Sequence, residues 1–236
     1  MNIVLVTAGG IGSRMHMDIP KQFLNIKDKP VIIYTLEAFQ KHPNIDAICV
    51  VCLKGWKEIL KAYAKQFNIT KLKWIVDGGE NGQASIKNGL DRLEQEFNKQ
   101  DIILIHDGNR PLVTQETISD CIIKCQQYGS GIAVVPCNTA ILEKKDKDNQ
   151  YSKCALDRDL LVITQTPHAF RLETLLCAHK EAAKQNITNS VASCTLMIEL
   201  GKTVHFAAGS ETNIKITNAD DLKIFKALLK IDKNKK

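Results

Sequence analysis

A glycine-rich stretch near the N-terminus carries residues that could grip a polyphosphate. Gly9, Gly10 and Gly12 follow a short apolar run, and the cations Arg14 and Lys21 come soon after them. Glycine allows a sharp turn and has no Cβ, so its backbone N–H groups stay open to an anion. Arginine adds forked contacts and lysine a mobile point charge. The stretch predicts a phosphate-binding loop; the alternative is a tight turn with two solvated cations.

Three phosphate-binding motifs can be told apart here. A Walker loop ends in Gly-Lys-Ser/Thr, which the stretch lacks. A Rossmann fingerprint opens a helix and places an acid about 20 residues further on. Pro20 interrupts any such helix, and Asp28 and Glu37 are poorly placed for the acid's role. A nicotinamide dehydrogenase is therefore disfavoured, and the loop of a nucleotidyltransferase remains.

Residues 8–24 resemble the signature of the cytidylyltransferases that act on methylerythritol 4-phosphate and ribitol 5-phosphate. The resemblance continues in order along nearly the whole chain, at residues 77–79, 85–90, 106–111, 157–158, 165–167 and 213–217. It implies transfer of CMP from CTP to a polyol phosphate with release of pyrophosphate. The amino-acid sequence of the loop, Gly-Gly-Ile-Gly-Ser-Arg-Met, is more similar to that of the ribitol 5-phosphate enzymes and favours this acceptor. The alternatives are the methylerythritol enzyme of isoprenoid synthesis and a nucleotide-binding homologue that has lost turnover.

The resemblance also implies a role for individual residues. The triphosphate would be held by the backbone of Ala8, Gly9, Gly10 and Gly12 and by the catalytic side chains Arg14, Lys21 and Lys215. Cytosine selection maps to Gly79, Glu80 and Ser85. The acceptor side maps to Asp107, Arg110, Thr139, Arg158 and Thr188. Mg²⁺ is the expected metal, because it neutralises triphosphates, and Asp107 is the candidate ligand.

Four residues depart from the pattern that the resemblance implies. Gly82 stands where arginine is common, Asn189 where an acid is common, His168 where glutamine is common, and Asn109 where alanine or valine is common. Most of these positions map to the acceptor side. The departures therefore concern the identity of the alcohol phosphate and not the transfer reaction.

The bulk composition indicates one large globular domain covering residues 1–236. The chain is 44% hydrophobic and 25% charged, and it has no apolar run long enough to span a membrane. Residues 222–236 hold six lysines and one acid, so they account for most of the net charge of +6. A lysine-rich tail explains this charge better than a nucleic-acid surface does. The eight cysteines form no zinc pattern, and we expect reduced thiols in a cytoplasmic protein.

The elements that must position these residues alternate along the chain. Strand-like runs at 3–6, 45–53, 72–76, 102–105 and 132–135 alternate with helix-like runs at 31–40, 56–67, 84–97 and 114–128. Helices at about 171–185 and 191–200, a strand near Val204, a strand at 213–217 and a last helix from about 219 complete the expectation. Continuously apolar strands between helices predict an α/β, Rossmann-like, mainly parallel sheet with helices on both faces. Ligands of such sheets lie beyond the carboxyl ends of the strands.

Residues 138–164 interrupt this alternation. The charged run at 143–149 reads as an exposed turn between two strand-like arms, which cannot bury their own faces well. By resemblance this protruding β-arm would pair two copies in a homodimer, with Thr139 and Arg158 reaching the partner's acceptor site. The alternative is a solvated surface excursion.

Overall fold

The computed structural model describes residues 1–10 and 19–233. Gly12 and Arg14, two of the expected phosphate-binding residues, lie outside the described residues.

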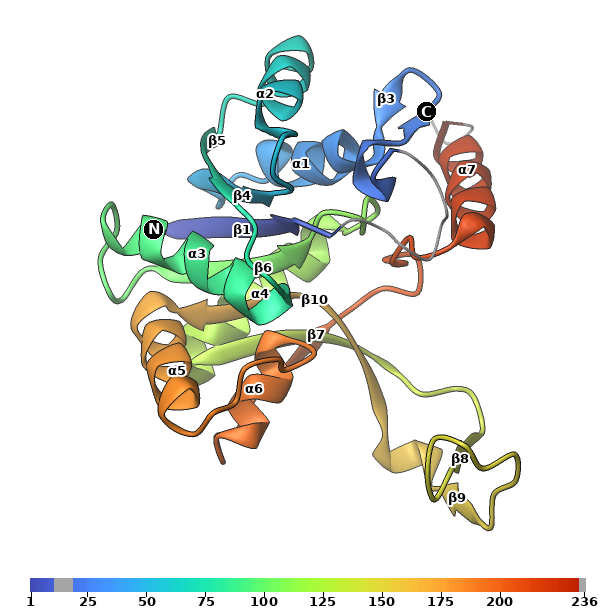
Figure 1. Cartoon of the computed structure of the whole chain (residues 1–236). Coiled ribbons are helices and arrows are strands. Elements are labelled where there is room, and N and C mark those ends of the chain that lie inside the picture. The colour runs from blue at the N-terminus through green and yellow to red at the C-terminus, as the bar shows by residue number, and fades with distance from the viewer. Residues whose placement is uncertain (11–18, 234–236) are drawn as a thin grey trace.

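A single seven-stranded sheet organises the molecule (Figure 1). Its strands run in the order β5 (Leu72–Asp77), β4 (Ala47–Cys52), β1 (Asn2–Ala8), β6 (Ile102–Asp107), β10 (Val162–Arg171), β7 (Ser130–Pro136) and β11 (Phe206–Ala208). Neighbouring strands are parallel except for β10, which is antiparallel to both β6 and β7. The expectation of a mainly parallel sheet is confirmed.

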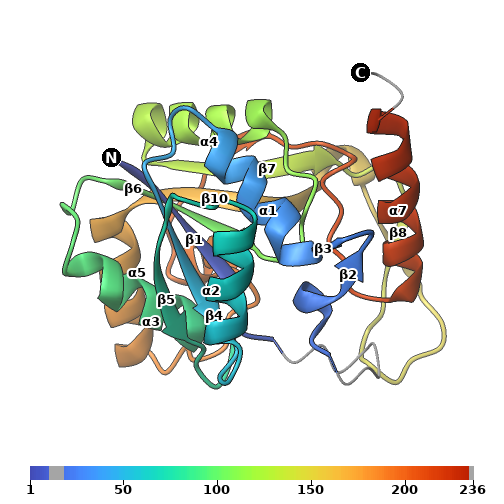
Figure 2. The same cartoon turned by 90° about the horizontal axis from the view of Figure 1, so that it is seen from above.

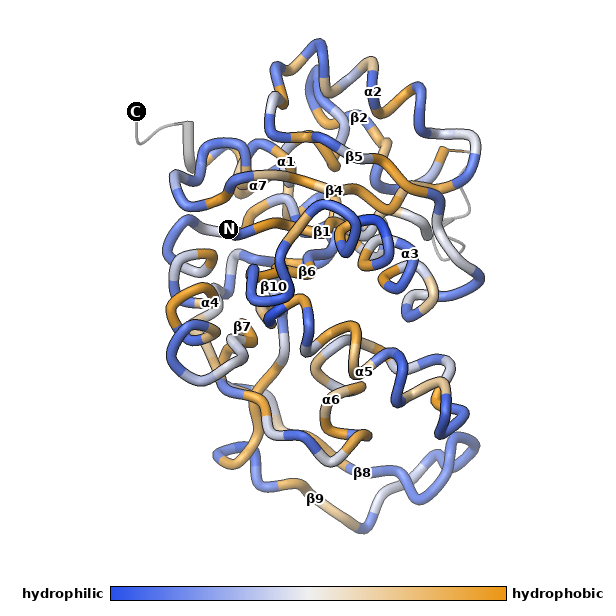
Figure 3. Tube along the Cα trace, turned by 90° about the vertical axis from the view of Figure 1, so that its left-hand side faces the viewer, coloured by the Kyte–Doolittle hydropathy of each residue, from blue (hydrophilic) through white to orange (hydrophobic). Residues whose placement is uncertain are grey.

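Helices cover both faces of the sheet, as the apolar strands predict. One face packs against α1 (Val31–Lys41), α2 (Lys57–Gln66) and α4 (Gln115–Tyr128), and the other against α3 (Gly82–Glu94), α5 (Leu172–Lys184) and α6 (Ser193–Glu199). Figure 3 shows apolar residues concentrated in the central strands. Cys49 and Cys52 of β4 belong to opposite cores, because residues three apart in a strand point to opposite faces. These two thiols are therefore small buried side chains on different sides of the sheet.

Local capping fixes where the helices begin and end. α3 starts two residues before the expected Ala84, because Asn81 Oδ1 accepts a hydrogen bond from the Ala84 N–H at 2.9 Å. α4 ends at Gly129, whose φ of +85° is the left-handed conformation that glycine tolerates best. Asn218 caps α7 (Ala219–Lys233), since its Oδ1 accepts from the N–H groups of Asp220 and Asp221.

Two sequence expectations about strands are wrong. Residues 165–170 of β10 were expected to belong to no element and Arg171 to begin a helix, although β10 is a central strand. Residues 213–217 form no strand; they are an extended segment attached through other contacts. The core made by this segment combines Ile216 with α7 and with the β2 (Asn25–Ile26) and β3 (Lys29–Pro30) hairpin, and Figure 2 shows α7 beside that hairpin.

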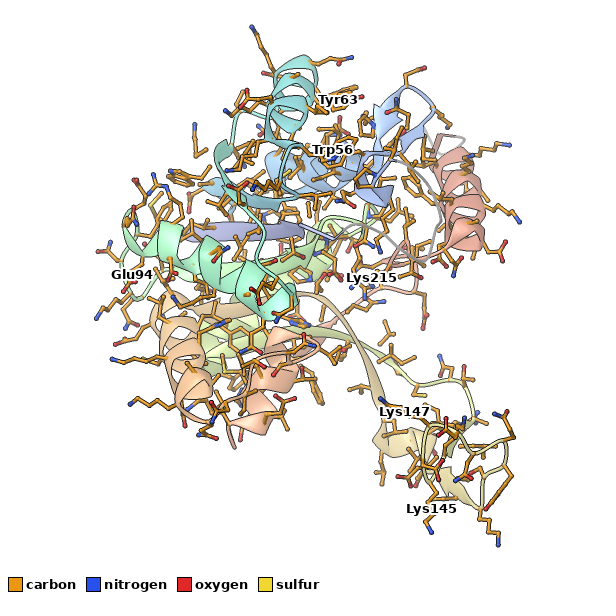
Figure 4. The ribbon with its side chains drawn as sticks, viewed as in Figure 1. Trp56, Tyr63, Glu94, Lys145, Lys147 and Lys215 are labelled. Atoms are coloured by element: carbon orange, nitrogen blue, oxygen red, sulfur yellow. The ribbon has the colours of Figure 1, made fainter. Side chains whose placement is uncertain are left out.

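An arm leaves the sheet between β7 and β10 (Figure 1). It contains the antiparallel pair β8 (Ile141–Glu143) and β9 (Cys154–Leu156), followed by a 3-10 turn, η3 (Arg158–Leu160). Lys145 and Lys147 lie at its far end (Figure 4). Leu142 is 64% exposed and Leu160 is 83% exposed, so the arm presents apolar side chains that this chain does not cover. Among the helices of residues 1–10 and 19–233, none is long and apolar enough to cross a membrane.

Candidate active site

Two adjoining cavities lie at the carboxyl ends of β1, β5 and β6. The first, of about 460 Å³, is bounded by the glycine stretch after β1, the segment after β5 and the end of β6. The second, of about 310 Å³, lies between β6 and β10 on one side and α3 and α6 on the other. Thr7, Gly82, Asp107 and Lys215 line both. The two cavities are therefore neighbours that share one wall.

Most of the expected nucleotide residues line the first cavity. They are Ala8, Gly9, Gly10, Lys21, Gly79, Glu80, Ser85 and Lys215. Asp107, which was expected on the acceptor side, lines the same cavity. Figure 4 shows Lys215 at the edge where the parallel strands end.

The backbones that follow β1 and β5 approach closely at the first cavity. A Cβ on Gly9 would lie 3.4 Å from the Gly78 Cα, and a Cβ on Gly79 would lie 2.6 Å from the Ala84 Cβ. The Gly79 N–H donates to Ser85 Oγ at 3.0 Å, which ties this segment to α3. Glycine at position 79 is therefore a packing requirement as well as an opening for a ligand.

The Gln22 side chain forms hydrogen bonds with the backbone of the glycine stretch. Its buried amide donates from Nε2 to the Ala8 carbonyl at 2.8 Å and to the Gly10 carbonyl at 3.0 Å. Holding these carbonyls fixes the path of the backbone before the loop. Sequence reasoning gave Gln22 no role; the only signal was an amide two residues after Pro20.

Asp107 is the electrostatic centre of the shared wall. Lys215 Nζ lies 3.0 Å from Asp107 Oδ1, and Arg110 Nε lies 3.0 Å from Oδ2. Burial raises the pKa of this carboxyl, but the charges of Lys215 and Arg110 outweigh burial and bring its pKa to about 2. Asp107 is thus ionised at neutral pH and holds two cations toward the cavities.

A buried network beneath Asp107 fixes the end of β6. The Asp107 N–H donates to Thr166 Oγ1 at 3.0 Å, Thr166 Oγ1 lies 3.0 Å from His106 Nδ1, and His106 Nε2 lies 3.1 Å from the Arg110 carbonyl. Burial lowers the pKa of His106 to about 4, so the ring is neutral. Because a carbonyl only accepts, Nε2 carries the proton and Nδ1 accepts from the Thr166 hydroxyl. Sequence reasoning missed this network.

The segment that carries Lys215 is held by one backbone hydrogen bond and by side-chain hydrogen bonds, instead of by a strand ladder. The Asn109 carbonyl accepts from the Ile216 N–H at 2.9 Å, and the Asn109 amide donates to the Ile216 carbonyl. Arg110 Nη1 donates to the Asn213 carbonyl at 2.7 Å. Ile216 is fully buried while the Lys215 side chain is 42% exposed, so the lysine points away from its apolar neighbours as expected.

The segment at 187–190 is joined to the start of α3. Asn81 Nδ2 donates to the Thr188 carbonyl at 3.1 Å. Gln83 Nε2 donates to the Ile187 carbonyl at 2.7 Å, and Gln83 Oε1 accepts from the Ser190 N–H at 2.8 Å. Thr188 itself lines neither cavity, but Ser190 lines the second. Gln83 is a further residue that sequence reasoning missed.

The remaining expected acceptor residues are divided between the body and the arm. Arg110 lines the second cavity together with Asp107. Thr139 and Arg158 are exposed on the arm and line neither cavity. Arg158 Nη1 donates to the Asn138 carbonyl at 3.4 Å, and its Nε lies 3.8 Å from Asp159 Oδ1. One chain therefore does not bring the arm residues to the site.

The cationic side chains that face Asp107 make its carboxylate a poor ligand for a metal ion bound by the protein alone. Within residues 1–10 and 19–233 no group of three or more His, Cys, Asp or Glu side chains is arranged to hold a metal ion. Both Asp107 oxygens already face a cation. Mg²⁺ usually binds through one or two carboxylates plus substrate phosphates and waters. The site fits a metal brought by a triphosphate better than one held by the protein alone.

A doubly covered sheet, with glycines and cations gathered beyond its strand ends around two adjoining cavities, is the arrangement of a nucleotide-binding α/β protein. Comparison with known proteins narrows this class. The sequence model of 2-C-methyl-D-erythritol 4-phosphate cytidylyltransferase matches residues 2–231. The chain belongs to this cytidylyltransferase family.

The relatives include enzymes named for two acceptors. The chain is 45% identical over 234 residues to a ribitol-5-phosphate cytidylyltransferase of Lacticaseibacillus paracasei, covering 98% of both. It is 37% identical over 223 residues to a 2-C-methyl-D-erythritol 4-phosphate cytidylyltransferase of Clostridium botulinum, covering 94% of both. The crystal structure of the Francisella tularensis 2-C-methyl-D-erythritol 4-phosphate cytidylyltransferase superposes with a TM-score of 0.77 at 26% identity, covering 94% of this chain and 97% of that one.

Proposed function

We propose that the protein transfers CMP from CTP to ribitol 5-phosphate and releases pyrophosphate. The observation that carries the proposal is the wall shared by two cavities, at which Asp107 presents Lys215 to both. A nucleotide in the first cavity and an acceptor phosphate near the second would meet there. The names of the more similar relatives support ribitol 5-phosphate as the acceptor.

In the proposed reaction an oxygen of the acceptor phosphate attacks the α-phosphorus of CTP. A phosphorus–oxygen bond forms as the bond from the α-phosphorus to the bridging oxygen breaks, and pyrophosphate leaves with that electron pair. The attacking oxygen is already ionised near neutral pH, so no side chain has to remove its proton. The protein therefore acts by placing the two phosphates in line and stabilising negative charge.

The residues of the first cavity would divide the nucleotide between them. Lys21 and the glycine backbone would hold the triphosphate, and Lys215 would stabilise charge at the α-phosphate. The segment of Gly79, Glu80 and Ser85 would face cytosine, because a small pocket lined with backbone groups favours a pyrimidine over a purine. Mg²⁺, when bound to the triphosphate, would neutralise part of its charge.

We further propose a cytoplasmic homodimer in which the arm of one chain completes the acceptor site of the other. The exposed Leu142 and Leu160 support this, since apolar side chains of this size are usually covered in an interface. Arg158 would then supply a forked contact to the acceptor phosphate of the partner's site.

The proposed reaction is tested by incubating the protein with CTP, Mg²⁺ and either ribitol 5-phosphate or 2-C-methyl-D-erythritol 4-phosphate, while pyrophosphate release and the CDP-polyol product are measured. We expect turnover with ribitol 5-phosphate and none with the Lys21→Ala or Lys215→Ala variant. Product only with the methylerythritol acceptor would establish the second candidate, which the family match favours. CTP binding with no product from either acceptor would identify an inactive nucleotide-binding homologue.

The dimer is tested by mixing two variants that are each inactive. Arg158→Ala removes the arm's contribution and Lys215→Ala removes that of the body. If the arm acts on the partner's site, each mixed dimer contains one intact site and one doubly defective site. Random pairing makes about half of the dimers mixed, so we expect up to about a quarter of the full activity. No recovery on mixing, despite a dimeric mass by light scattering, would contradict the exchange.

A further inference from the structure

Three buried polar atoms around the second cavity have no hydrogen-bond partner among residues 1–10 and 19–233. They are His168 Nε2, His179 Nε2 and Ser193 Oγ. The three residues are only 2%, 6% and 3% exposed. Buried polar side-chain atoms nearly always have a partner, since leaving one unsatisfied costs stability. Three such atoms around one cavity indicate a site built for a polar ligand.

The sheet register directs His168 toward this cavity. His168 lies opposite Ile105 of β6 and Ile132 of β7, and residues paired across strands share a face of the sheet. Ile105 also lines the cavity. Ser193 comes from the first turn of α6 and His179 from α5, on the helix layer that covers this face. The three side chains thus line the same cavity from the sheet and from the helices.

The charge of these groups tells which kind of ligand they suit. Burial lowers the pKa of His168 to about 4, although Asp107 nearby raises it in part. Burial also lowers the pKa of His179 to about 4. At neutral pH both rings are uncharged, and a neutral ring, like a serine hydroxyl, offers one hydrogen bond without charge. Such groups match hydroxyl groups, whereas the anionic phosphate would be served by the charged Arg110 and Lys215, which line the same cavity.

We propose that the second cavity binds the hydroxyl groups of the acceptor's carbon chain, with His168 and Ser193 as specificity-determining residues. This inference rests on the proposed function. Ribitol carries a hydroxyl group on every carbon that is not phosphorylated. Methylerythritol has a shorter chain, one hydroxyl fewer and a methyl branch. A cavity with several unpaired polar atoms favours the former, because a methyl group would leave a buried polar atom unsatisfied.

The test compares acceptor kinetics of the wild-type protein with His168→Phe, His168→Gln and Ser193→Ala. Phenylalanine keeps the size of the ring and removes its hydrogen bond, whereas glutamine keeps a polar group. The matched control is His205→Phe, because His205 stacks on Tyr128 away from the cavity. The Michaelis constants for CTP, ribitol 5-phosphate and 2-C-methyl-D-erythritol 4-phosphate are measured for each.

We expect His168→Phe to raise the KM for ribitol 5-phosphate about tenfold, as the loss of one buried hydrogen bond predicts, with the KM for CTP unchanged. His168→Gln should recover part of the loss, Ser193→Ala should act in the same direction, and the preference for ribitol over methylerythritol phosphate should fall. Unchanged ribitol 5-phosphate kinetics in folded His168→Gln and Ser193→Ala would overturn the inference and leave the proposed function intact. No turnover of ribitol 5-phosphate by the wild-type protein would instead overturn the proposed function, and this inference with it.

Discussion

Replacing Asp107 with asparagine removes the negative charge that holds Arg110 and Lys215 at the shared wall, while it keeps the shape of the side chain. Asp107 faces Arg110 and Lys215, each at 3.0 Å, and its side chain is 18% exposed. In the variant both cations lose their partner. We expect the free energy of unfolding to fall at neutral pH and turnover to fall with it, because Lys215 is no longer held toward both cavities.

The magnitude follows from the pKa of this carboxyl. Its pKa is about 2 in the folded protein against 3.8 for the ordinary group. A depression of this size corresponds to about 2 kcal/mol of stability at neutral pH. Because the folded pKa is the lower one, the contribution is complete above 3.8 and is lost as the pH falls toward 2.

The assay is urea unfolding of the wild-type protein and Asp107→Asn at pH 7, 5 and 3. We expect the stability difference to be about 2 kcal/mol at pH 7 and 5 and to be roughly halved at pH 3. Asp220→Asn is the control, since Asp220 pairs with Lys223 where both side chains are about 80% exposed, and such surface pairs contribute little. A difference that does not change between pH 5 and pH 3 would refute the electrostatic account of Asp107.

Three further changes probe the site. Lys215→Ala should lower kcat about a hundredfold or more while the melting temperature stays within a few degrees, and an unchanged kcat would remove Lys215 from the reaction. Gly79→Ala should destabilise the fold by about 1–3 kcal/mol, because the new Cβ would meet the backbone of α3. Gly10→Ala should leave unfolding unchanged and raise the KM for CTP, because no atom of the described residues lies within 4 Å of the new Cβ; equal stabilities of the two variants would contradict the packing argument. Gln83→Leu should raise the KM for the acceptor more than that for CTP, since it releases the 187–190 segment; the reverse order would show that the segment serves the nucleotide.

The parallel part of the fold follows from local sequence patterns. Runs such as residues 3–6 and 102–105 are apolar without interruption, and in the structure they are buried on both faces between helices. Helix boundaries also follow where a cap is visible, as at Asn218. These features depend on neighbours in the sequence, which is why a single sequence reveals them.

The two strand errors have a common origin in long-range contacts. The missed part of β10 contains polar residues and Pro167, which are unusual in a central strand, and the register shifts between Thr164 and His168 where proline offers no N–H. The 213–217 segment alternates like a strand, but Asn109 and Arg110 satisfy its backbone and leave no ladder. A local sequence pattern does not show which residues from distant parts of the chain will form hydrogen bonds with a given backbone segment.

The same distinction applies to the site. Asp107, Lys215 and the glycines were expected from their motifs, and the structure gathers those it describes around one cavity. Gln22 and Gln83 were not expected, because glutamine has no characteristic spacing and each acts on a backbone that only folding brings near. The arm residues Thr139 and Arg158 were expected at the acceptor, and their role stays a prediction.

The common wall between the two cavities restricts how this protein could acquire a new substrate. Asp107 and Lys215 line both cavities. In the proposed reaction a substitution at either residue would therefore affect nucleotide and acceptor together. His168 and Ser193 line the second cavity and not the first. Substitutions that adapt the protein to another alcohol, in nature or in the laboratory, should therefore occur on β10 and α6, while the residues of the shared wall stay unchanged.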